Sequence, residues 1–249
     1  MSKLFEEIDS QSSPLGEISL RRRRIPALGD RDIYEVKLGE EFLMSSMFVE
    51  AEEALSRLGL AQVQGDKLNV VVGGLGLGYT AVAALKDDRI SELLVVEALD
   101  TVIGWHNDEL VPLGKTLNAD TRNRYVHGSF FDMATAPDTG FDPENPGRRF
   151  DAILLDIDHS PTEYLNAANA GFYTTDNLAL MAEQLNPGGV FAMWSQNLPE
   201  ERFEALLKTV FETVESHVVS FYNPFLSGES TNSVYVCVKG SVSDSGDGQ

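Results

Sequence analysis

The sequence has few cysteines, few histidines and no long apolar run. Its single cysteine, Cys237, excludes a disulfide within the chain, and its four histidines are scattered without the spacing of zinc ligands. No run of about 18 apolar residues is present, and the first residues lack the basic start and apolar core of a signal peptide. We therefore expect a cytoplasmic protein with no metal site and no membrane contact.

Positive charge is also scarce. The chain has 19 Lys and Arg residues against 39 Asp and Glu residues, a formal net charge of −20. Proteins that bind nucleic acids carry a basic face, so this balance argues against nucleic acids and is compatible with a small cationic substrate. The run Arg21 to Arg24 is the exception, and we interpret it as an exposed strand rather than a nucleic-acid arm.

The length of 249 residues predicts one large domain, or one domain with a small appendage. Residues 1–17 and 241–249 are polar, and we expect a flexible N-terminus and a disordered tail. Two β-rich runs flank Gly39-Glu40 and predict a β-hairpin, while apolar residues from Met47 to Leu58 recur at helical spacing. We therefore expect a small N-terminal unit, a hairpin plus a helix, over residues 18–66.

Residues 67–240 alternate apolar, β-rich runs with amphipathic segments. Continuous apolar strands between helices predict a parallel sheet covered on both faces, an α/β, doubly wound, Rossmann-like domain. Two final runs have no helix between them and predict an antiparallel hairpin that completes a seven-stranded, mostly parallel sheet. The expected strands are 68–73, 92–98, 124–128, 150–156, 189–194, 215–222 and 232–239, and the expected helices are 77–86, 100–110, 174–185 and 200–213.

The first strand of this domain runs into a glycine loop, Gly73, Gly74, Gly76 and Gly78, and a helix follows. Glycines let the backbone turn tightly and approach a ligand, and the helix start offers unpaired N–H groups. Glu97 ends the next strand, where a carboxylate can accept both hydroxyls of a ribose. The spacing G-x-G-x-G is typical of S-adenosylmethionine-dependent enzymes rather than NAD enzymes, and the absence of a Walker lysine disfavours a nucleoside triphosphate.

The third strand ends at Gly128 and Ser129, followed by Phe130 and Asp132. In an open α/β sheet the ligand lies over the carboxyl ends of the strands, so Ser129 or Asp132 could bind the adenine beside Phe130. The alternative is a core phenylalanine pair capped by Asp132.

The fourth strand delivers two carboxylates, Asp156 and Asp158, and then His159. Two carboxylates at this spacing raise the pKa of one another, and such a group can take a proton from an ammonium nucleophile while the other holds a positive charge. Both aspartates are therefore candidate catalytic residues. The alternative for Asp158 is a turn cap before Pro161, through hydrogen bonds to nearby N–H groups.

Taken together, these motifs resemble the spermidine synthase family of aminopropyltransferases, a branch of the class I methyltransferase fold. The resemblance covers roughly residues 18–239. It implies a homodimer, an amine acceptor and decarboxylated S-adenosylmethionine as co-substrate. It further implies that Asp156 is the base, that Glu97 binds the ribose and that the glycine loop holds the nucleoside. The segments that carry it are VVVGGLGLG, VVEALD, FDAILLDIDHSP, GFYTTDNLALMAEQLNPGGVFAMW and the late SG of FLSGES.

Several family positions carry different residues here. Gly76 replaces an aspartate that holds the aminopropyl ammonium, and Phe48 replaces a tyrosine two residues before Glu50. Trp194 stands in place of a glutamine, and Phe225 lies near the place of a late tyrosine. Phe48, Glu50, Trp194 and Phe225 are thus candidate substrate residues in an altered polyamine pocket. Two alternatives stay open, an S-adenosylmethionine-dependent methyltransferase and a non-catalytic nucleoside-binding protein.

Overall fold

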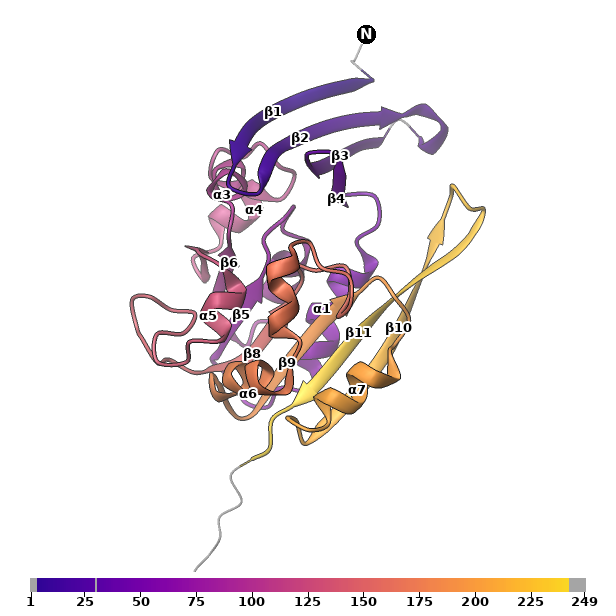
Figure 1. Ribbon diagram of the computed structural model, residues 1–249. Helices are drawn as coiled ribbons and strands as arrows, with labels where there is room; N and C mark the ends of the chain where they lie inside the picture. Colours follow the sequence, from indigo (N-terminus) through magenta and orange to yellow (C-terminus); the bar gives the residue numbers. More distant parts are fainter. Residues whose placement is uncertain (1–3, 30, 242–249) are drawn as a thin grey trace, which may run out of the picture.

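The computed structural model describes residues 4–29 and 31–241, and it contains two β-sheets stacked along the molecule. A four-stranded antiparallel sheet from the N-terminal residues lies over one edge of a larger, seven-stranded sheet (Figure 1). The expected disordered tail lies outside the described residues, apart from its first residue. Within the described ranges, no helix is both long enough and apolar enough to cross a membrane.

The N-terminal sheet has the order β1-β2-β3-β4 and is antiparallel throughout. The turn at Gly39 and Glu40 joins the expected hairpin strands. The predicted flexible N-terminus is wrong for residues 5–13, which form a strand. The bounds are β1 (Phe5–Ser13), β2 (Gly16–Ile25), β3 (Arg31–Leu38) and β4 (Glu41–Ser45), with a short 3-10 turn, η1 (Pro26–Leu28), after β2.

Cross-strand ion pairs join β2 to both of its neighbours, β1 and β3. Each arginine of the Arg21 to Arg24 run on β2 faces an acidic residue on β1 or β3. The pairs are Arg21 with Glu7 at 3.3 Å, Arg22 with Glu6, Arg23 with Glu35, and Arg24 with Asp32 at 2.7 Å. Opposite charges on facing strands stabilise a sheet where apolar side chains are few. The four arginines are therefore strand residues with acidic partners, as the sequence indicated.

Helix α1 (Glu50–Ala61) belongs with the larger sheet, although we grouped it with the N-terminal hairpin. It packs against β8, β9 and β11, and its inward residues Ala51 and Leu55 are buried. Gly59 allows the close approach, because a Cβ there would lie 2.8 Å from the side chain of Leu154. The N-terminal unit thus ends at β4, and the helix that follows covers the large sheet.

The seven-stranded sheet has the order β10-β11-β9-β8-β5-β6-β7. The pairings among β5, β6, β7, β8 and β9 are parallel, whereas β11 runs antiparallel to both β9 and β10. This confirms the predicted mostly parallel sheet with a terminal hairpin. The bounds are β5 (Leu68–Gly73), β6 (Ile90–Glu97), β7 (Asn123–His127), β8 (Phe150–Leu155), β9 (Leu185–Ser195), β10 (Thr213–Asn223) and β11 (Gly228–Val238).

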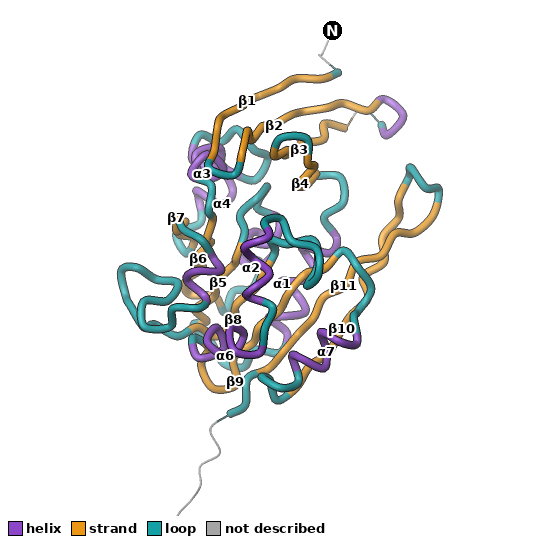
Figure 2. The backbone as a smooth tube through the Cα atoms, viewed as in Figure 1, coloured by secondary structure: helices purple, strands orange, loops and turns teal. Residues whose placement is uncertain are grey.

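Helices cover both faces of this sheet (Figure 2). Successive strand residues alternate between two buried clusters, so Val70 and Val72 face α1 and α2 while Val71 faces the α6 side. The four predicted helices α2, α3, α6 and α7 are present, whereas α4, α5 and η2 were not predicted. The bounds are α2 (Tyr79–Leu85), α3 (Asp100–Asn107), α4 (Gly114–Ala119), α5 (Phe130–Ala134), η2 (Ala167–Phe172), α6 (Thr175–Glu183) and α7 (Glu201–Leu207).

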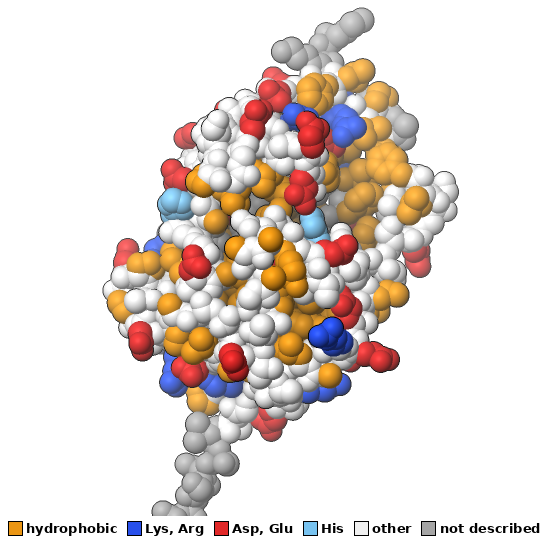
Figure 3. All heavy atoms as spheres, viewed as in Figure 1, with side chains coloured by type: hydrophobic (Ala, Val, Ile, Leu, Met, Phe, Trp, Pro, Cys, Tyr) orange, Lys and Arg blue, Asp and Glu red, His pale blue; other side chains and the backbone are white. Residues whose placement is uncertain are grey.

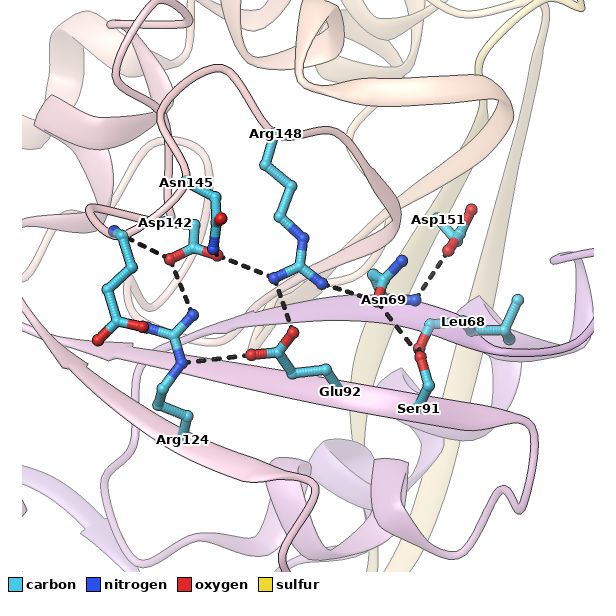
Figure 4. A network of polar contacts seen from close by, with 10 residues as sticks. Leu68, Asn69, Ser91, Glu92, Arg124, Asp142, Asn145, Arg148 and Asp151 are labelled. Atoms are coloured by element: carbon cyan, nitrogen blue, oxygen red, sulfur yellow. Dashed lines mark hydrogen bonds and ion pairs between the residues drawn. The ribbon is translucent and has the colours of Figure 1, made fainter.

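An ionic network around the buried Asp142 ties the segment after α5 to the strands β6 and β7 (Figure 4). Asp142 has no exposed surface, and its two carboxylate oxygens accept hydrogen bonds of 2.8 Å from Arg124 and from Arg148. Arg148 also binds Glu92 at 2.7 Å. Both arginines lower the pKa of Asp142 and outweigh its burial, which acts to raise it. The network holds the long connection before β8 against the sheet, away from the glycine loop.

Candidate functional site

A cavity of about 580 Å³ lies between the carboxyl ends of the large sheet and the N-terminal sheet above them. Figure 3 shows hydrophobic side chains gathered around this hollow. Its volume is in the range of small-molecule sites, and its position is where open α/β sheets bind ligands. Residues of the glycine loop, Glu97, Ser129 and Asp156 all reach it, so the sheet brings together most of the predicted site.

The glycine loop is shaped by close contact with β8. Gly74 has a positive φ of 95°, and a Cβ there would lie 2.2 Å from the carbonyl oxygen of Asp156. The Asp156 N–H donates to Gly73 O at 2.8 Å, which ties the two strand ends together. Only glycine allows this backbone at Gly74 without displacing the candidate catalytic strand end.

Glu97 is held beside the glycine loop by two backbone hydrogen bonds. Its Oε2 accepts from Leu75 N at 3.0 Å, and its Oε1 accepts from Leu99 N at 2.9 Å. Burial raises the pKa of this carboxyl, and the backbone donors act in the opposite direction. A carboxylate has about four acceptor positions, so both oxygens can still accept hydroxyl groups from the cavity.

Asp156 follows β8 and lies in the cavity wall. Its Oδ2 accepts a hydrogen bond of 2.5 Å from Thr80 Oγ1 at the start of α2. Burial raises the pKa of Asp156 to about 6, against the lowering effect of that hydrogen bond. A carboxyl with a pKa near neutrality is suited to exchange protons with an amine.

Glu52, on the first turn of α1, is a second acidic residue of the cavity, and the sequence analysis missed it. Burial, followed by the negative charge of Asp156, raises the pKa of Glu52 to about 8. Glu50, which we predicted as a candidate substrate residue, lies two residues before Glu52 and is exposed. Its carboxylate accepts a hydrogen bond of 2.9 Å from the N–H of Val49. Glu50 does not line the cavity. The spacing of apolar residues predicts the helix, but it does not show which of these two glutamates faces a cavity.

Asp158 does not line the cavity, and its hydrogen bonds run to residues beyond Pro161 rather than to a turn before it. Its side chain is buried, Oδ1 accepts from Leu165 N at 2.7 Å and Asn169 Nδ2 at 2.8 Å, and Oδ2 accepts from the Tyr173 hydroxyl at 2.8 Å. All of these partners lie in the segment after β8. Asp158 therefore orders the loop that follows Asp156, and the structure gives it no place among candidate catalytic residues. The neighbouring His159 lines the cavity and contacts Glu41 of β4 at 3.1 Å.

The residues that follow β7, from Gly128 to Phe130, lie partly in the cavity wall and partly in the hydrophobic core. Ser129 lines the cavity and caps α5, because its hydroxyl accepts from the N–H of Asp132 at 3.3 Å. Phe130 is buried and stacks on Phe141 with ring centroids 5.0 Å apart. Gly128 packs beneath Met133 and does not line the cavity. Phe130 also lines the cavity, so its position fits both interpretations of this segment, and Ser129 remains a candidate adenine contact, whereas Asp132 does not line the cavity.

Three aromatic side chains line the cavity near the ends of β9 and β10. Phe48 lies 5.4 Å from Phe221 between ring centroids, and Trp194 completes the group. The indole N–H of Trp194 is buried and has no hydrogen-bond partner among the described residues. The candidate substrate residue Phe225 is 62% exposed in the β10–β11 turn and does not line the cavity, whereas Phe221, four residues earlier, does. The sequence does not show the register of this hairpin, and the register decides which of its residues face the cavity.

Gly76 is covered by the N-terminal sheet. A Cβ at Gly76 would lie 2.3 Å from Met44 Sδ, and the N–H of Leu77 donates to the same sulfur at 3.0 Å. The carbonyl oxygen of Gly76 is 2.9 Å from His106 Nε2, and burial lowers the pKa of His106 to about 4. A neutral imidazole therefore fixes the loop from one side while Met44 fills the space above it. Among the described residues, no group of three or more His, Cys, Asp or Glu side chains is placed to hold a metal ion.

No protein-family model matches the chain, and no curated protein matches it in sequence. Among solved structures, it is similar to spermidine synthase from Thermotoga maritima, with a TM-score of 0.69 and 18% identity over 94% of this chain and 72% of that one. It is also similar to a spermidine synthase in complex with the transition state analogue AdoDATO, with a TM-score of 0.70 and 18% identity over 94% of this chain and 74% of that one. This likeness confirms the predicted fold of the spermidine synthases.

Proposed function

We propose that this chain is a transferase that binds an S-adenosyl-type sulfonium nucleoside and transfers a group from it to an amine. The favoured donor is decarboxylated S-adenosylmethionine, and the group is then aminopropyl. The observation that carries the proposal is that Glu97 and Asp156 line one cavity on the two sides of the glycine loop. The fold shared with spermidine synthases, one of them in complex with AdoDATO, supports the same reaction class.

The order of the strands supports a different role for each half of the cavity. The ends of β5, β6 and β7 carry Gly74, Glu97 and Ser129, which suit an adenosine. Glu97 accepts the two ribose hydroxyls there, and Ser129 lies toward the adenine. Asp156 ends β8, the next strand on the other side of β5. An amine on that side meets the carboxylate next to the bound donor.

The chemistry requires a base at this place, because a protonated amine has no lone pair with which to attack. Asp156 takes one proton from the ammonium. The freed nitrogen attacks the carbon bonded to the sulfonium, a C–N bond forms and the C–S bond breaks. The electron pair of the broken C–S bond stays on sulfur. The products are a neutral thioether nucleoside and a protonated secondary amine. The proton on Asp156 then leaves to solvent.

Methyl transfer is the second candidate, and the contact between Met44 and Gly76 favours it. In the spermidine synthase pattern, an aspartate at this loop position holds the ammonium of the aminopropyl group. Here a thioether covers a glycine, so this point of the loop offers no charge to that ammonium. Attack on the methyl carbon of S-adenosylmethionine uses the same base and leaves S-adenosylhomocysteine.

The product nucleosides distinguish the candidates by thermal shift of the purified protein. Methylthioadenosine should raise the melting temperature if the donor is decarboxylated S-adenosylmethionine, whereas S-adenosylhomocysteine should do so for methyl transfer. A protein that responds to neither contradicts the proposed function.

Asp156→Asn then tests the base, since it keeps the shape of the side chain but accepts no proton. Turnover should fall by about 10²–10⁴-fold with the product nucleoside still bound. The exposed Asp176→Asn is the control and should change neither quantity. Retained turnover in Asp156→Asn would exclude Asp156 as the base.

A further inference from the structure

The acceptor side of the cavity has an uneven distribution of charge. Beyond Asp156, the sheet continues through β9, β11 and β10, and Trp194, Asn232 and Phe221 of these strands line the cavity. Phe48 joins them from the segment before α1, against Phe221. The carboxylate that this side adds is Glu52. It lies one turn of α1 before Ser56, whose hydroxyl donates to the carbonyl oxygen of Thr80, and the Thr80 hydroxyl in turn donates to Asp156. Glu52 and Asp156 line the same cavity, and their charges interact. The negative charge is thus concentrated at one end, and aromatic rings form the other.

Other acidic residues do not change this arrangement. Among the described lining residues, the remaining carboxylate is Glu97, on the nucleoside side and bound by two backbone N–H groups. Glu163 is exposed and outside the lining, and its carboxylate accepts from Gln196 and Asn197, each at 2.9 Å. The polar groups near the rings are the neutral amides of Gln196 and Asn232, the indole N–H of Trp194, and the imidazole of His159. The ring of His159 faces the carboxylate of Glu41 at 3.1 Å.

This distribution matters because amines differ in where they carry charge. A linear diamine at neutral pH is an ammonium at both ends. With one end at Asp156, its far ammonium would lie among rings and amides, where burying an unpaired charge is costly. A monoamine puts its single charge at the carboxylates and its apolar body against the rings, which gains from burial.

We infer that the acceptor is a primary monoamine with an alkyl or aryl body, and that linear diamines are poor acceptors. The inference rests on the proposed function, because it concerns the acceptor of that transfer. It holds for either donor, since the residues of the acceptor side are the same in both cases. Glu52 and Asp156 receive the single ammonium, and Phe48, Trp194 and Phe221 receive the body.

The test compares n-pentylamine with 1,4-diaminobutane. These two probes have the same length and differ in a terminal methyl group in place of a terminal ammonium. Their dissociation constants are measured by calorimetry, with the full chain and the stabilising product nucleoside present. We expect n-pentylamine to bind about tenfold more tightly or better, and 2-phenylethylamine to bind at least as well as n-pentylamine.

A charge placed at the aromatic end provides the second arm. Phe221 lies partly buried on the edge strand β10, where a new side chain is tolerated. Phe221→Glu supplies a carboxylate for the far ammonium and should shift the preference toward 1,4-diaminobutane by about tenfold or more. Phe221→Gln removes the ring without adding charge. It should weaken n-pentylamine binding and should not create a preference for the diamine.

The outcomes separate this inference from the proposed function. Wild-type protein that binds the diamine as well as the monoamine, or binds neither, overturns the inference, and so does a Phe221→Glu variant with an unchanged ratio. Diamine binding as tight as monoamine binding would mean that the rings hold an ammonium as an aromatic cage. A third outcome is that neither product nucleoside stabilises the wild type, but the wild type still prefers n-pentylamine when no nucleoside is present. That result would support the proposed amine site and contradict the proposed transferase function.

Discussion

Thr80 Oγ1 donates a hydrogen bond of 2.5 Å to Asp156 Oδ2, and this contact joins the start of α2 to the end of β8. The Thr80 backbone is itself held, since its carbonyl oxygen accepts from Ser56 Oγ of α1 at 2.7 Å. Three elements thus fix the position of one carboxylate. The hydrogen bond lowers the pKa of Asp156, against burial, and keeps it near the range in which a general base operates.

Thr80→Val should raise the pKa of Asp156 further, because it removes the donor and keeps the shape. A hydrogen bond to a charged group is worth about 1.5–3 kcal/mol, which corresponds to roughly 1–2 pH units. The acidic limb of the profile of kcat/KM against pH should therefore move upward by about that amount. Thr80→Ser keeps the hydroxyl and is the control. An unmoved limb in the valine variant would show that Asp156 is not the group that titrates.

Glu52→Gln should make the protein more stable at high pH. The pKa of Glu52 is raised to about 8 from an unfolded value of about 4.3, so the folded state binds the extra proton between these values. Its contribution to stability is present below about pH 4 and is lost as the pH rises through about 8. Thermal unfolding at pH 5 and pH 9 should show a smaller loss in the variant than in the wild type. Glu53→Gln, exposed on the same helix, should behave as the wild type, and equal losses in all three would contradict the effect.

Much of the fold could be predicted because its strands are distinctive. Apolar runs such as Leu68–Gly73 are buried on both faces, which only a covered parallel sheet allows, and the glycines after them mark the turn into a helix. The polar β1 has no such pattern. It is held by backbone pairing with β2 and by contacts from distant residues, such as the hydrogen bond of 2.6 Å from the Trp105 indole to Asp9. The helix α1 was placed in the wrong unit because spacing shows that a helix has a buried face but not which sheet covers it.

The candidate site was predictable where the backbone itself sets the position. Glu97 and Asp156 end parallel strands, and these ends meet at one sheet edge whatever the loops do. Asp158 lies only two residues further, but its role depends on a loop that folds back so that Tyr173 and Asn169 bind it. Glu52 reaches the cavity because α1 packs against β8, β9 and β11, a tertiary arrangement without a local sequence pattern.

Asp142→Asn should destabilise the protein at neutral pH by roughly 1.5–3 kcal/mol, because it removes the negative charge that pairs with Arg124 and Arg148, two partly exposed arginines. The pKa of Asp142 is depressed, so its contribution is present above the unfolded value of about 3.9 and is lost as the pH falls below it. Urea unfolding should therefore show a large difference from the wild type at pH 7 and a smaller one below pH 4. Glu144→Gln, whose side chain is 73% exposed, is the control and should change little. An equal difference at both pH values would contradict this account.

Glu97→Gln should weaken binding of the stabilising product nucleoside about tenfold or more, since charged hydrogen bonds to the ribose are worth about 1.5–3 kcal/mol. The amide keeps the size but loses the charge. Its NH₂ group accepts no hydrogen bond, so one of the N–H groups of Leu75 and Leu99 loses its partner. Calorimetric titration measures the loss, with the exposed Glu201→Gln as the control.

A 2′-deoxy analogue of the same nucleoside makes the assignment specific to Glu97 and the ribose. The wild type should bind the analogue more weakly than the parent nucleoside, whereas Glu97→Gln should discriminate less between them, because the partner of the missing hydroxyl is already impaired. Full discrimination in the Glu97→Gln variant would place the ribose against another residue. The deletion of one group on each side of the contact thus isolates the contact itself from any wider effect of the substitution on the loop.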